Sequence, residues 1–369
     1  MPKKNVIPLC YAGFFNQTGY GQASQDYILA LDRSNNYDIK IKVFGEHITR
    51  PAISDERYLL LREMQKRKIS DDAIQIFHCI PTIQKRIKKL EKNIGFATFE
   101  TFGPPVNWIK ILNENDAIIV PSLFDYKIFN HSDLKKPIFY IPHAIDFNNY
   151  NKDVIPLNRY DRFSFLFMGT WKERKGYKQL IEAFLTEFSL EDNVQLIIKT
   201  DKPKKANLYL DKVRKQIKKP KGFAPILIEL KIFNEQELPS FMKSFDCFVL
   251  ATFGEGFCYP GIQSMALNVP VIITNFSGCK DYANEETATL LEPEGFILYN
   301  QMDSIPQFRN RKWAFVSVKS IRKKMREVLN NPDMVKNKAN VAYNYVKERF
   351  SYGRIEQLFR KMLFSLYYG

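Results

Sequence analysis

The sequence has little cysteine and little histidine, and it has no apolar run that approaches the length of a membrane span. It contains 5 Cys and 4 His in 369 residues, and no two cysteines have the C-x-x-C spacing of a metal site. The short apolar stretch at residues 6–11 is too short for the core of a signal peptide, and a membrane span needs about 20 apolar residues. We therefore expect reduced thiols in a cytoplasmic protein without a transmembrane segment. Peripheral attachment to a membrane surface is an alternative.

Acidic residues are also few relative to basic ones. The 40 Asp and Glu against 55 Lys and Arg give a formal net charge of +15. Such a charge favours anionic partners, namely nucleic acid, acidic lipid or phosphorylated small molecules, without selecting one of them. Basic residues gather at 85–92, 202–221 and 309–326, and the second of these clusters has nine of them with Asp211 as its single acid. Each cluster is also compatible with an ordinary solvated helix face.

The order of apolar segments predicts an α/β protein with parallel sheets. Strand-like and helix-like stretches alternate along the chain, and its length suits two domains. A run rich in Asn, Asp, Tyr and Pro at 143–162 predicts a linker between two series of such stretches. We therefore expect an N-terminal Rossmann-like domain at 1–150 and a C-terminal one at 151–350. Residues 351–369 are expected to form a helix that packs back on the N-terminal domain.

The segment 254–272, GEGFCYPGIQSMALNVPVI, carries the most specific pattern. Its glycine-flanked Glu255 follows a predicted strand, and Pro260 suits the first turn of a helix. Free N–H groups at a helix start attract phosphate, and a carboxylate in the same loop can accept hydrogen bonds from sugar hydroxyls. Gln263 lies eight positions after Glu255, inside the expected helix. A tight strand–helix connection with an incidental acid is the alternative.

This segment resembles the signature of retaining glycosyltransferase family 4, whose members have the GT-B fold. The resemblance implies two Rossmann-like domains with parallel sheets that face each other across a cleft. It implies that Glu255 holds hydroxyls of the donor sugar. A second Glu in that family holds the nucleotide ribose, and this sequence has Gln263 there. Gln keeps a hydrogen-bond acceptor but loses the charge, which leaves the preferred nucleotide open.

A second segment, from Phe167 to Phe184, resembles the strand, loop and helix that present cations to the donor diphosphate in that family. Arg174 and Lys175 would neutralise the charge that develops as the glycosidic bond breaks. Members often carry an Arg directly after the strand glycine, whereas this sequence has Thr170. An exposed basic turn is the alternative interpretation of Arg174 and Lys175.

The resemblance implies further donor-binding positions and covers roughly residues 6–350. Gly19 and Gly21 resemble the glycine loop of the first strand, which approaches the donor phosphates across the cleft. Lys199 ends a predicted strand of the C-terminal domain. The remaining expected donor contacts follow Glu255 directly, and they are Gly256, Phe257 and Cys258.

Three residues of the N-terminal domain are candidates for the acceptor side. Glu100 stands where many relatives carry a His that faces the donor sugar and the acceptor. Its carboxylate could stabilise an oxocarbenium-like transition state or accept the acceptor's proton, and a structural acid is the alternative. His78 ends a predicted strand and is either an acceptor contact or a structural histidine. His143 lies beside the linker.

The sequence thus predicts a retaining hexosyl- or pentosyltransferase that uses a nucleotide sugar, with a UDP-sugar as the leading donor. The catalytic candidates are Glu100, Arg174, Lys175 and Glu255. A front-face reaction is implied, in which the leaving diphosphate takes the acceptor's proton. No Asp-x-Asp occurs in the sequence, so we expect no metal, and no cofactor besides the donor. The expected acceptor is a hydroxyl of a saccharide or glycoconjugate.

Other functions stay open. A polyanionic acceptor, either hydroxylated DNA bases or a membrane lipid, would suit the net charge. Residues 82–92 could form a basic amphipathic helix on an anionic membrane, or an ordinary helix of the N-terminal domain. A nucleotide-sugar epimerase and a sugar phosphorylase share the fold, although we identify no cofactor lysine for the latter. Gln263 and Thr170 leave room for a non-catalytic protein that binds nucleotide or nucleic acid.

Overall fold

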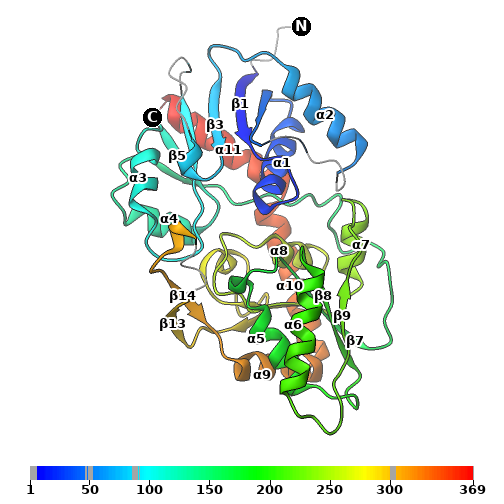
Figure 1. Cartoon of the computed structure of the whole chain (residues 1–369). Coiled ribbons are helices and arrows are strands. Elements are labelled where there is room, and N and C mark those ends of the chain that lie inside the picture. The colour runs from blue at the N-terminus through cyan, green and yellow to red at the C-terminus, as the bar shows by residue number, and fades with distance from the viewer. Residues whose placement is uncertain are drawn as a thin grey trace. The chain divides into compact units, whose positions relative to one another are not determined.

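The chain divides into two compact units, shown in the computed structural model of Figure 1. Unit 1 comprises Met1–Phe147 and Lys347–Gly369, and unit 2 comprises Asn148–Val346. The structure describes residues 6–45, 48, 53–84, 90, 92–299 and 305–368. The end of the chain therefore returns to the unit in which the chain begins.

Unit 1 is built around six parallel strands in the order β2-β1-β3-β4-β5-β6. The strands are β1 (Ile7–Gly13), β2 (Tyr37–Val43), β3 (Ile74–His78), β4 (Asn93–Phe96), β5 (Ala117–Val120) and β6 (Ile138–Tyr140). Strands β3, β4 and β5 are buried along their whole length, as is usual for parallel strands that are covered on both faces. Their carboxyl ends share one edge of the sheet, so the loops that follow them gather there.

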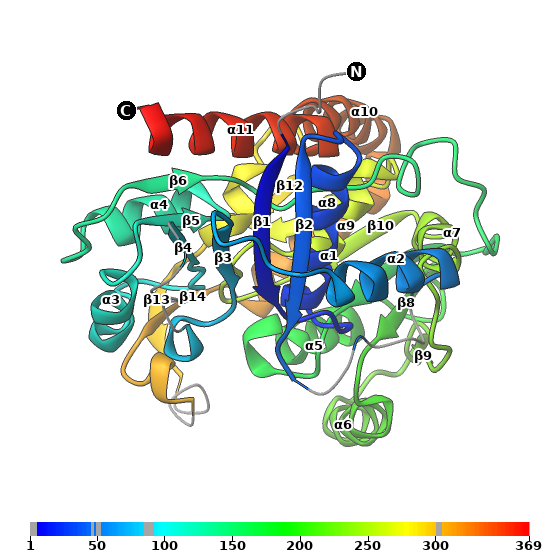
Figure 2. The same cartoon turned by 90° about the horizontal axis from the view of Figure 1, so that it is seen from above.

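Helices cover this sheet, and the last helix of the chain is one of them. They are α1 (Gly19–Asp32), α2 (Asp55–Lys66), α3 (Val106–Leu112), α4 (Leu123–Asn130) and α11 (Tyr352–Tyr368). The Thr18 hydroxyl accepts the N–H of Gly21 at 3.2 Å and so caps the start of α1. Helix α11 packs against α1 (Figure 2), where the Tyr352 hydroxyl donates to Asp26 Oδ1 at 2.7 Å.

Unit 2 repeats the plan with six parallel strands in the order β12-β11-β10-β7-β8-β9. They are β7 (Phe163–Met168), β8 (Val194–Lys199), β9 (Ile226–Glu229), β10 (Cys247–Leu250), β11 (Val271–Thr274) and β12 (Thr289–Leu291). A separate antiparallel pair is formed by β13 (Gly295–Leu298) and β14 (Lys312–Phe315). Because β10 pairs with both β7 and β11, the loops after these three strands are neighbours.

The helices of unit 2 lie on both faces of its sheet. They are α5 (Tyr177–Glu187), α6 (Pro203–Gln216), α7 (Glu237–Lys243), α8 (Tyr259–Ala266), α9 (Val318–Asn330) and α10 (Pro332–Phe350), whose last residues belong to unit 1. Helix α5 follows Gly176, which has φ 68°. A Cβ at this position would lie 1.7 Å from the carbonyl oxygen of Ala251, so only glycine allows α5 to start here.

The predicted α/β class with two parallel sheets is confirmed. Helix α6 was not predicted, because its buried stripe of Ala206, Leu210 and Val213 lies within a run of charged residues. Helix α4 and the short strands β12, β13 and β14 were also missed. The helix predicted at 82–92 falls largely outside the described residues, which show only a 3-10 turn at Pro81–Ile83.

Candidate functional site

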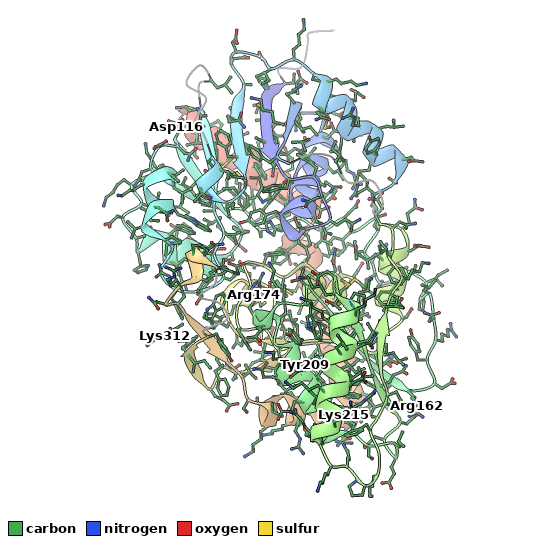
Figure 3. The ribbon with its side chains drawn as sticks, viewed as in Figure 1. Asp116, Arg162, Arg174, Tyr209, Lys215 and Lys312 are labelled. Carbon is green, nitrogen blue, oxygen red and sulfur yellow. The ribbon has the colours of Figure 1, made fainter. Side chains whose placement is uncertain are left out.

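Three of the predicted residues meet at the carboxyl edge of the unit 2 sheet. Arg174 and Lys175 lie in a 3-10 turn after β7, and Glu255 lies in the loop after the neighbouring strand β10. Lys175 Nζ is 2.6 Å from Glu255 Oε1, and Arg174 Nη1 is 3.0 Å from Glu255 Oε2. The three side chains are largely buried, and Figure 3 marks the position of Arg174. They form one centre, in which a single carboxylate holds two cations.

Backbone contacts bind the two loops to each other around this centre. The N–H of Phe253 donates to the carbonyl oxygen of Arg174 at 2.7 Å, and the Thr252 hydroxyl donates to the same oxygen at 2.8 Å. Arg174 Nη1 also donates to the carbonyl oxygen of Gly254 at 3.0 Å. The Thr252 hydroxyl lies 3.1 Å from Glu255 Oε1 as well. Thr252 is therefore part of the centre, although the sequence analysis did not single it out.

The charges of the two cations decide the protonation of Glu255. Burial by itself would raise the pKa of this carboxyl group, but Arg174 and Lys175 outweigh it and lower the pKa to about 2. Glu255 is therefore ionised across the whole neutral range. A ligand that brought further negative charge to this centre would bind both cations and loosen their hold on the carboxylate.

The loop after β11 holds the backbone of Glu255. The N–H of Glu255 donates to Ser277 Oγ at 2.8 Å, and Ser277 Oγ donates to the carbonyl oxygen of Glu255 at 2.9 Å. The N–H of Gly278 donates to that same oxygen at 2.9 Å. A Cβ on Gly278 would lie 2.0 Å from the carbonyl oxygen of Gly256, so the two loops touch through their main chains.

Helix α8 follows the Glu255 loop and carries the second predicted donor residue. Its N-cap is Cys258, with φ 72°. Gln263 is buried, and its Nε2 has no hydrogen-bond partner within the part of the chain that the structure describes. An unpartnered buried amide is costly, and a ligand oxygen would satisfy it. Phe257 is buried against Tyr282, with ring centroids 5.7 Å apart.

Lys199 ends β8, next to the end of β7. It pairs in register with Met168, and its carbonyl oxygen accepts the N–H of Gly169 at 3.0 Å. Its ammonium lies 5.8 Å from the centre of the Phe233 ring. Burial lowers the pKa of Lys199, and Glu229 on the adjacent strand opposes that shift. Lys199 thus shares the sheet edge with the centre of Arg174, Lys175 and Glu255.

The two histidine candidates of unit 1 lie together inside an aromatic cluster. His78 is completely buried, and its ring centroid is 4.0 Å from that of Phe96 and 5.9 Å from that of His143. His78 Nδ1 is 2.7 Å from the Tyr11 hydroxyl, and His143 Nδ1 is 3.0 Å from the Tyr27 hydroxyl. Burial lowers the pKa of His78 well below its ordinary value and that of His143 to about 3. Both rings are therefore neutral at pH 7.

Glu100, Gly19 and Gly21 also lie at the carboxyl edge of the unit 1 sheet. Glu100 follows β4 and is half-buried. Asp125 fixes the residues just before it by accepting the N–H of Phe99 at 2.8 Å. Gly19 opens α1, and a Cβ added there would meet nothing within 4 Å in the described ranges beyond its own helix backbone and chain neighbours, whereas a Cβ at Gly21 would lie 2.1 Å from the carbonyl oxygen of Asn16.

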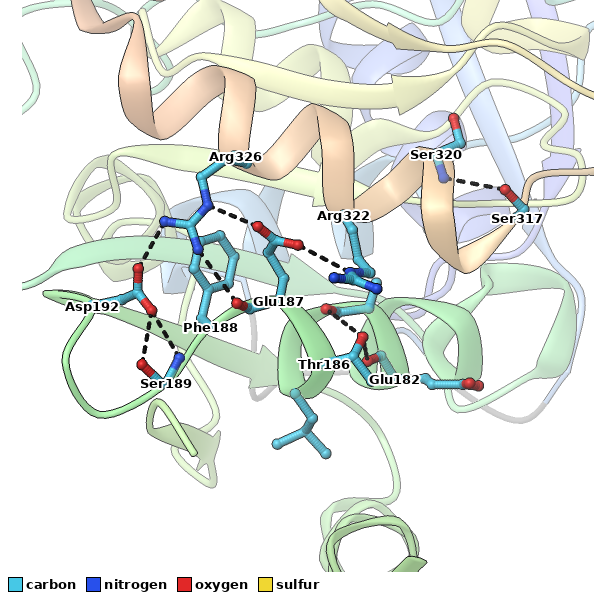
Figure 4. A network of polar contacts seen from close by, with 12 residues as sticks. Glu182, Thr186, Glu187, Phe188, Ser189, Asp192, Ser317, Ser320, Arg322 and Arg326 are labelled. Atoms are coloured by element: carbon cyan, nitrogen blue, oxygen red, sulfur yellow. Dashed lines mark hydrogen bonds and ion pairs between the residues drawn. The ribbon is translucent and has the colours of Figure 1, made fainter. Parts of the chain in front are cut away.

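Unit 2 contains a second carboxylate that is held by two cations, remote from this edge. Glu187 at the end of α5 binds Arg322 at 2.9 Å and Arg326 at 2.8 Å, both from α9 (Figure 4). Arg326 also binds Asp192 at 2.7 Å. This network joins α5 to α9, which pack on each other. Like the centre of Glu255, it holds one carboxylate between two cations, but it lies where two helices pack.

The described ranges contain neither a cluster of metal ligands nor a membrane-spanning helix. They contain no group of three or more His, Cys, Asp and Glu side chains that could hold a metal ion. None of the helices in those ranges combines the length and the apolar character that crossing a membrane would require.

One segment of the chain, which includes Glu255, matches a known protein family. Residues 162–298 match the family described as Glycosyl transferases group 1. This segment begins just before β7 and ends with β13, so it includes Arg174, Lys175 and Glu255. A comparison with curated proteins finds no match.

Solved structures of similar fold cover nearly the whole chain. Anabaena HepE, in complex with UDP and glucose, has a TM-score of 0.68 at 12% identity and covers 97% of this chain and 100% of its own. Sucrose-phosphate synthase from Thermosynechococcus elongatus has a TM-score of 0.69 at 12% identity, with 98% and 99% covered. A glycosyltransferase from Rickettsia africae has a TM-score of 0.64 at 13% identity, with 99% and 100% covered.

These findings establish the fold of the chain. The chain has the GT-B fold that these structures share, as the sequence analysis expected. Within unit 2, residues 162–298 match the group 1 glycosyl transferase family, and the centre of Arg174, Lys175 and Glu255 lies inside this match.

Proposed function

We propose that the protein is a retaining glycosyltransferase that moves a hexose or pentose from a nucleotide sugar to a hydroxyl group of a saccharide or glycoconjugate. The observation that carries the proposal is the buried centre in which Glu255 binds Arg174 and Lys175. It lies within the segment that matches group 1 glycosyl transferases. Two cations suit a diphosphate leaving group, and a buried carboxylate suits the hydroxyls of a sugar.

The proposed reaction needs no nucleophile from the protein. The bond between the anomeric carbon and the diphosphate oxygen breaks, and the acceptor oxygen bonds to the same face of that carbon. The acceptor's proton passes to the departing phosphate oxygen. Arg174 and Lys175 would neutralise the growing charge on the diphosphate without a metal, and Glu255 would hold the sugar in place.

A UDP-sugar is the proposed donor, and the bound UDP and UDP-glucose in the HepE structures support it. The remaining donor contacts are proposed to come from Lys199, Gln263 and the loop that follows Glu255. The Nε2 of Gln263, which has no hydrogen-bond partner among the described residues, can donate to a ligand oxygen. Glu100 is the candidate for the acceptor side in unit 1.

The exposed face of helix α6 supports a second candidate for the acceptor. Helix α6 exposes a face where Leu208, 71% exposed, lies among lysines. Figure 3 marks Lys215 on this helix, and Figure 2 shows the helix almost along its axis. This face favours a polyanionic acceptor, either DNA bases or a membrane lipid, as the alternative to a neutral glycan.

A ligand panel followed by a turnover assay tests the proposal. Melting curves are recorded with UDP, GDP, ADP and CMP and with their common sugar conjugates. A ligand present at 100 times its Kd stabilises the folded protein by about 2.7 kcal/mol, so one nucleotide series, UDP as expected, should raise the Tm. Release of nucleotide from the donor, stimulated by an acceptor, would then establish transfer. Binding without release would favour a non-catalytic protein, and no shift with any nucleotide would overturn the proposal.

A further inference from the structure

Two residues around Glu255 have a backbone conformation that their side chains disfavour. The described non-glycine residues with positive φ are Asn35, Cys258, Asn268, Ser277 and Asn310. Asparagine tolerates this left-handed region, because its short amide can bond to the local backbone. The two exceptions are Cys258, at φ 72°, and Ser277, at φ 53°. Both lie in loops that contact Glu255, one just after it and one after β11.

The unusual conformation of Ser277 lets its hydroxyl bond to both polar groups of the Glu255 main chain. Ser277 Oγ accepts the N–H of Glu255 at 2.8 Å and donates to its carbonyl oxygen at 2.9 Å. The side chain of Ser277 is completely buried. A hydroxyl has one donor and two acceptor lone pairs, and Glu255 takes the donor and one of the acceptor sites.

Glycine would occupy this backbone position at less cost than serine. A non-glycine residue in the left-handed region is strained, whereas glycine occupies that region freely. Strain of this kind is typical of functional sites. What serine supplies and glycine lacks is the hydroxyl, which both donates to Glu255 and accepts from it.

The fixed main chain determines where the carboxylate of Glu255 lies. Glu255 must reach Lys175 at 2.6 Å and Arg174 at 3.0 Å from a loop that has no regular secondary structure. A bound diphosphate would compete for these two cations. The carboxylate would then lose part of its own anchoring, and the two hydrogen bonds between the Glu255 main chain and the Ser277 hydroxyl would remain.

We propose that Ser277 is a positioning residue, whose hydroxyl holds the main chain of Glu255 so that the carboxylate meets the donor sugar. The effect on sugar binding rests on the proposed function. The pair of hydrogen bonds between the Ser277 hydroxyl and the Glu255 main chain, called the clamp below, is a property of the ligand-free protein. The positioning role predicts that loss of the hydroxyl weakens recognition of the sugar and not of the nucleotide.

Two substitutions of Ser277 separate positioning from stability. Ser277→Gly removes the hydroxyl and its two hydrogen bonds to Glu255, and relief of the backbone strain offsets part of that loss, so its Tm should change little. Ser277→Thr keeps the hydroxyl in a more strained residue, so its Tm should fall. If positioning is the role, the glycine variant loses sugar recognition and the threonine variant keeps it. If Ser277 had only a structural role, sugar recognition would fall with Tm. The threonine variant would then lose more of it than the glycine variant.

The experiment combines hydrogen exchange with binding. Exchange of the Glu255 amide is measured in the ligand-free wild type and in both variants, and affinities for UDP and UDP-glucose are measured by calorimetry. We expect at least tenfold faster exchange in Ser277→Gly and at least a fivefold fall in the ratio of UDP-glucose to UDP affinity. Ser164→Ala is the control, because Ser164 is also completely buried with a hydrogen-bonded hydroxyl, on β7. It should leave both quantities unchanged.

The results distinguish this inference from the proposed function. Wild-type exchange at Glu255 in Ser277→Gly would overturn the clamp, whatever the ligand is. Faster exchange with an unchanged affinity ratio would overturn the positioning role. If the wild type bound no sugar nucleotide at all, the proposed function would fail, and the exchange result would still decide whether the clamp exists.

Discussion

Lys175 and Glu255 form the shortest of the ion pairs in the candidate site, with 2.6 Å between Nζ and Oε1. The residues come from loops that follow adjacent strands, β7 and β10, which pair in parallel. Arg174 holds the other carboxylate oxygen at 3.0 Å. Two cations on one carboxylate leave a local charge of +1, so the centre is prepared for an anion and is not neutral without one.

Glu255→Gln should destabilise the protein in a manner that anions reverse. The substitution leaves two largely buried cations without their counter-ion, and breaking such a pair costs about 3 kcal/mol. Phosphate or UDP should restore much of the lost Tm in this variant and raise the wild-type Tm less. Melting curves in chloride and in phosphate at equal ionic strength test this.

Glu187→Gln is the matched control for that measurement. Glu187 also binds two cations, Arg322 and Arg326, but at the packing of α5 on α9. Its loss should lower the Tm without making the Tm sensitive to phosphate or UDP. Equal rescue of both variants by phosphate would contradict a specific anion site at the centre of Glu255.

Lys175→Met should lower kcat strongly and change the Tm little. Loss of a charge that stabilises a leaving group typically lowers kcat by about 10²–10³-fold. The rate of UDP release from a UDP-sugar is the readout, with Lys178→Met as control, since Lys178 forms its ion pair with Glu173 instead. A kcat within a factor of three of wild type would remove Lys175 from the mechanism.

Gly278→Ala should disrupt the site through the main chain. The added Cβ would lie 2.0 Å from the carbonyl oxygen of Gly256 and 3.0 Å from that of Glu255, so the Glu255 loop must move. We expect loss of UDP-glucose binding together with a lower Tm. Gly353→Ala in α11 adds a Cβ that meets no other part of the described chain within 4 Å beyond its own helix backbone, and alanine favours a helix, so it should be neutral or stabilising. Retained binding in Gly278→Ala would contradict the observed packing of the two loops.

Acid should destabilise unit 1 through its buried histidines. Burial lowers the pKa of His143 from its ordinary 6.5 to about 3, so below pH 6.5 the unfolded chain binds a proton that the folded state does not. Stability therefore falls as the pH drops from 6.5 toward 3, by up to about 1.4 kcal/mol per pH unit for each histidine. Urea unfolding at pH 5, 6 and 7 tests this, and His143→Gln should show a smaller slope than wild type. An identical slope would show that His143 is accessible to protons in the folded state.

Much of the fold and the core of the candidate site could be predicted from the sequence. The strand predicted to end at Lys199 does end there. The acid of 254–272 and the cations Arg174 and Lys175 could be selected because both patterns are local, each a strand end followed by a helix start. That they meet follows from the pairing of β7 with β10. The resemblance implied only that both loops contact the same donor.

The supporting contacts could not be predicted, because they depend on conformation and on residues far apart in the sequence. The role of Ser277 requires a positive φ and a loop 22 positions from Glu255. The burial of His78 depends on Tyr11, Tyr27 and Phe96, which come from three different elements. A strand-end position predicted that His78 would lie at the sheet edge but not that aromatic rings would enclose it.

Calorimetric titration of UDP-glucose and UDP into the wild type and into Glu255→Gln tests the central claim most directly. The claim is that the carboxylate of Glu255 binds the sugar, while Arg174 and Lys175 bind the diphosphate. We expect the wild type to bind UDP-glucose more tightly than UDP. The variant should bind UDP at least as well as the wild type and gain nothing from the glucose. A variant that still prefers UDP-glucose by the wild-type factor would contradict the claim.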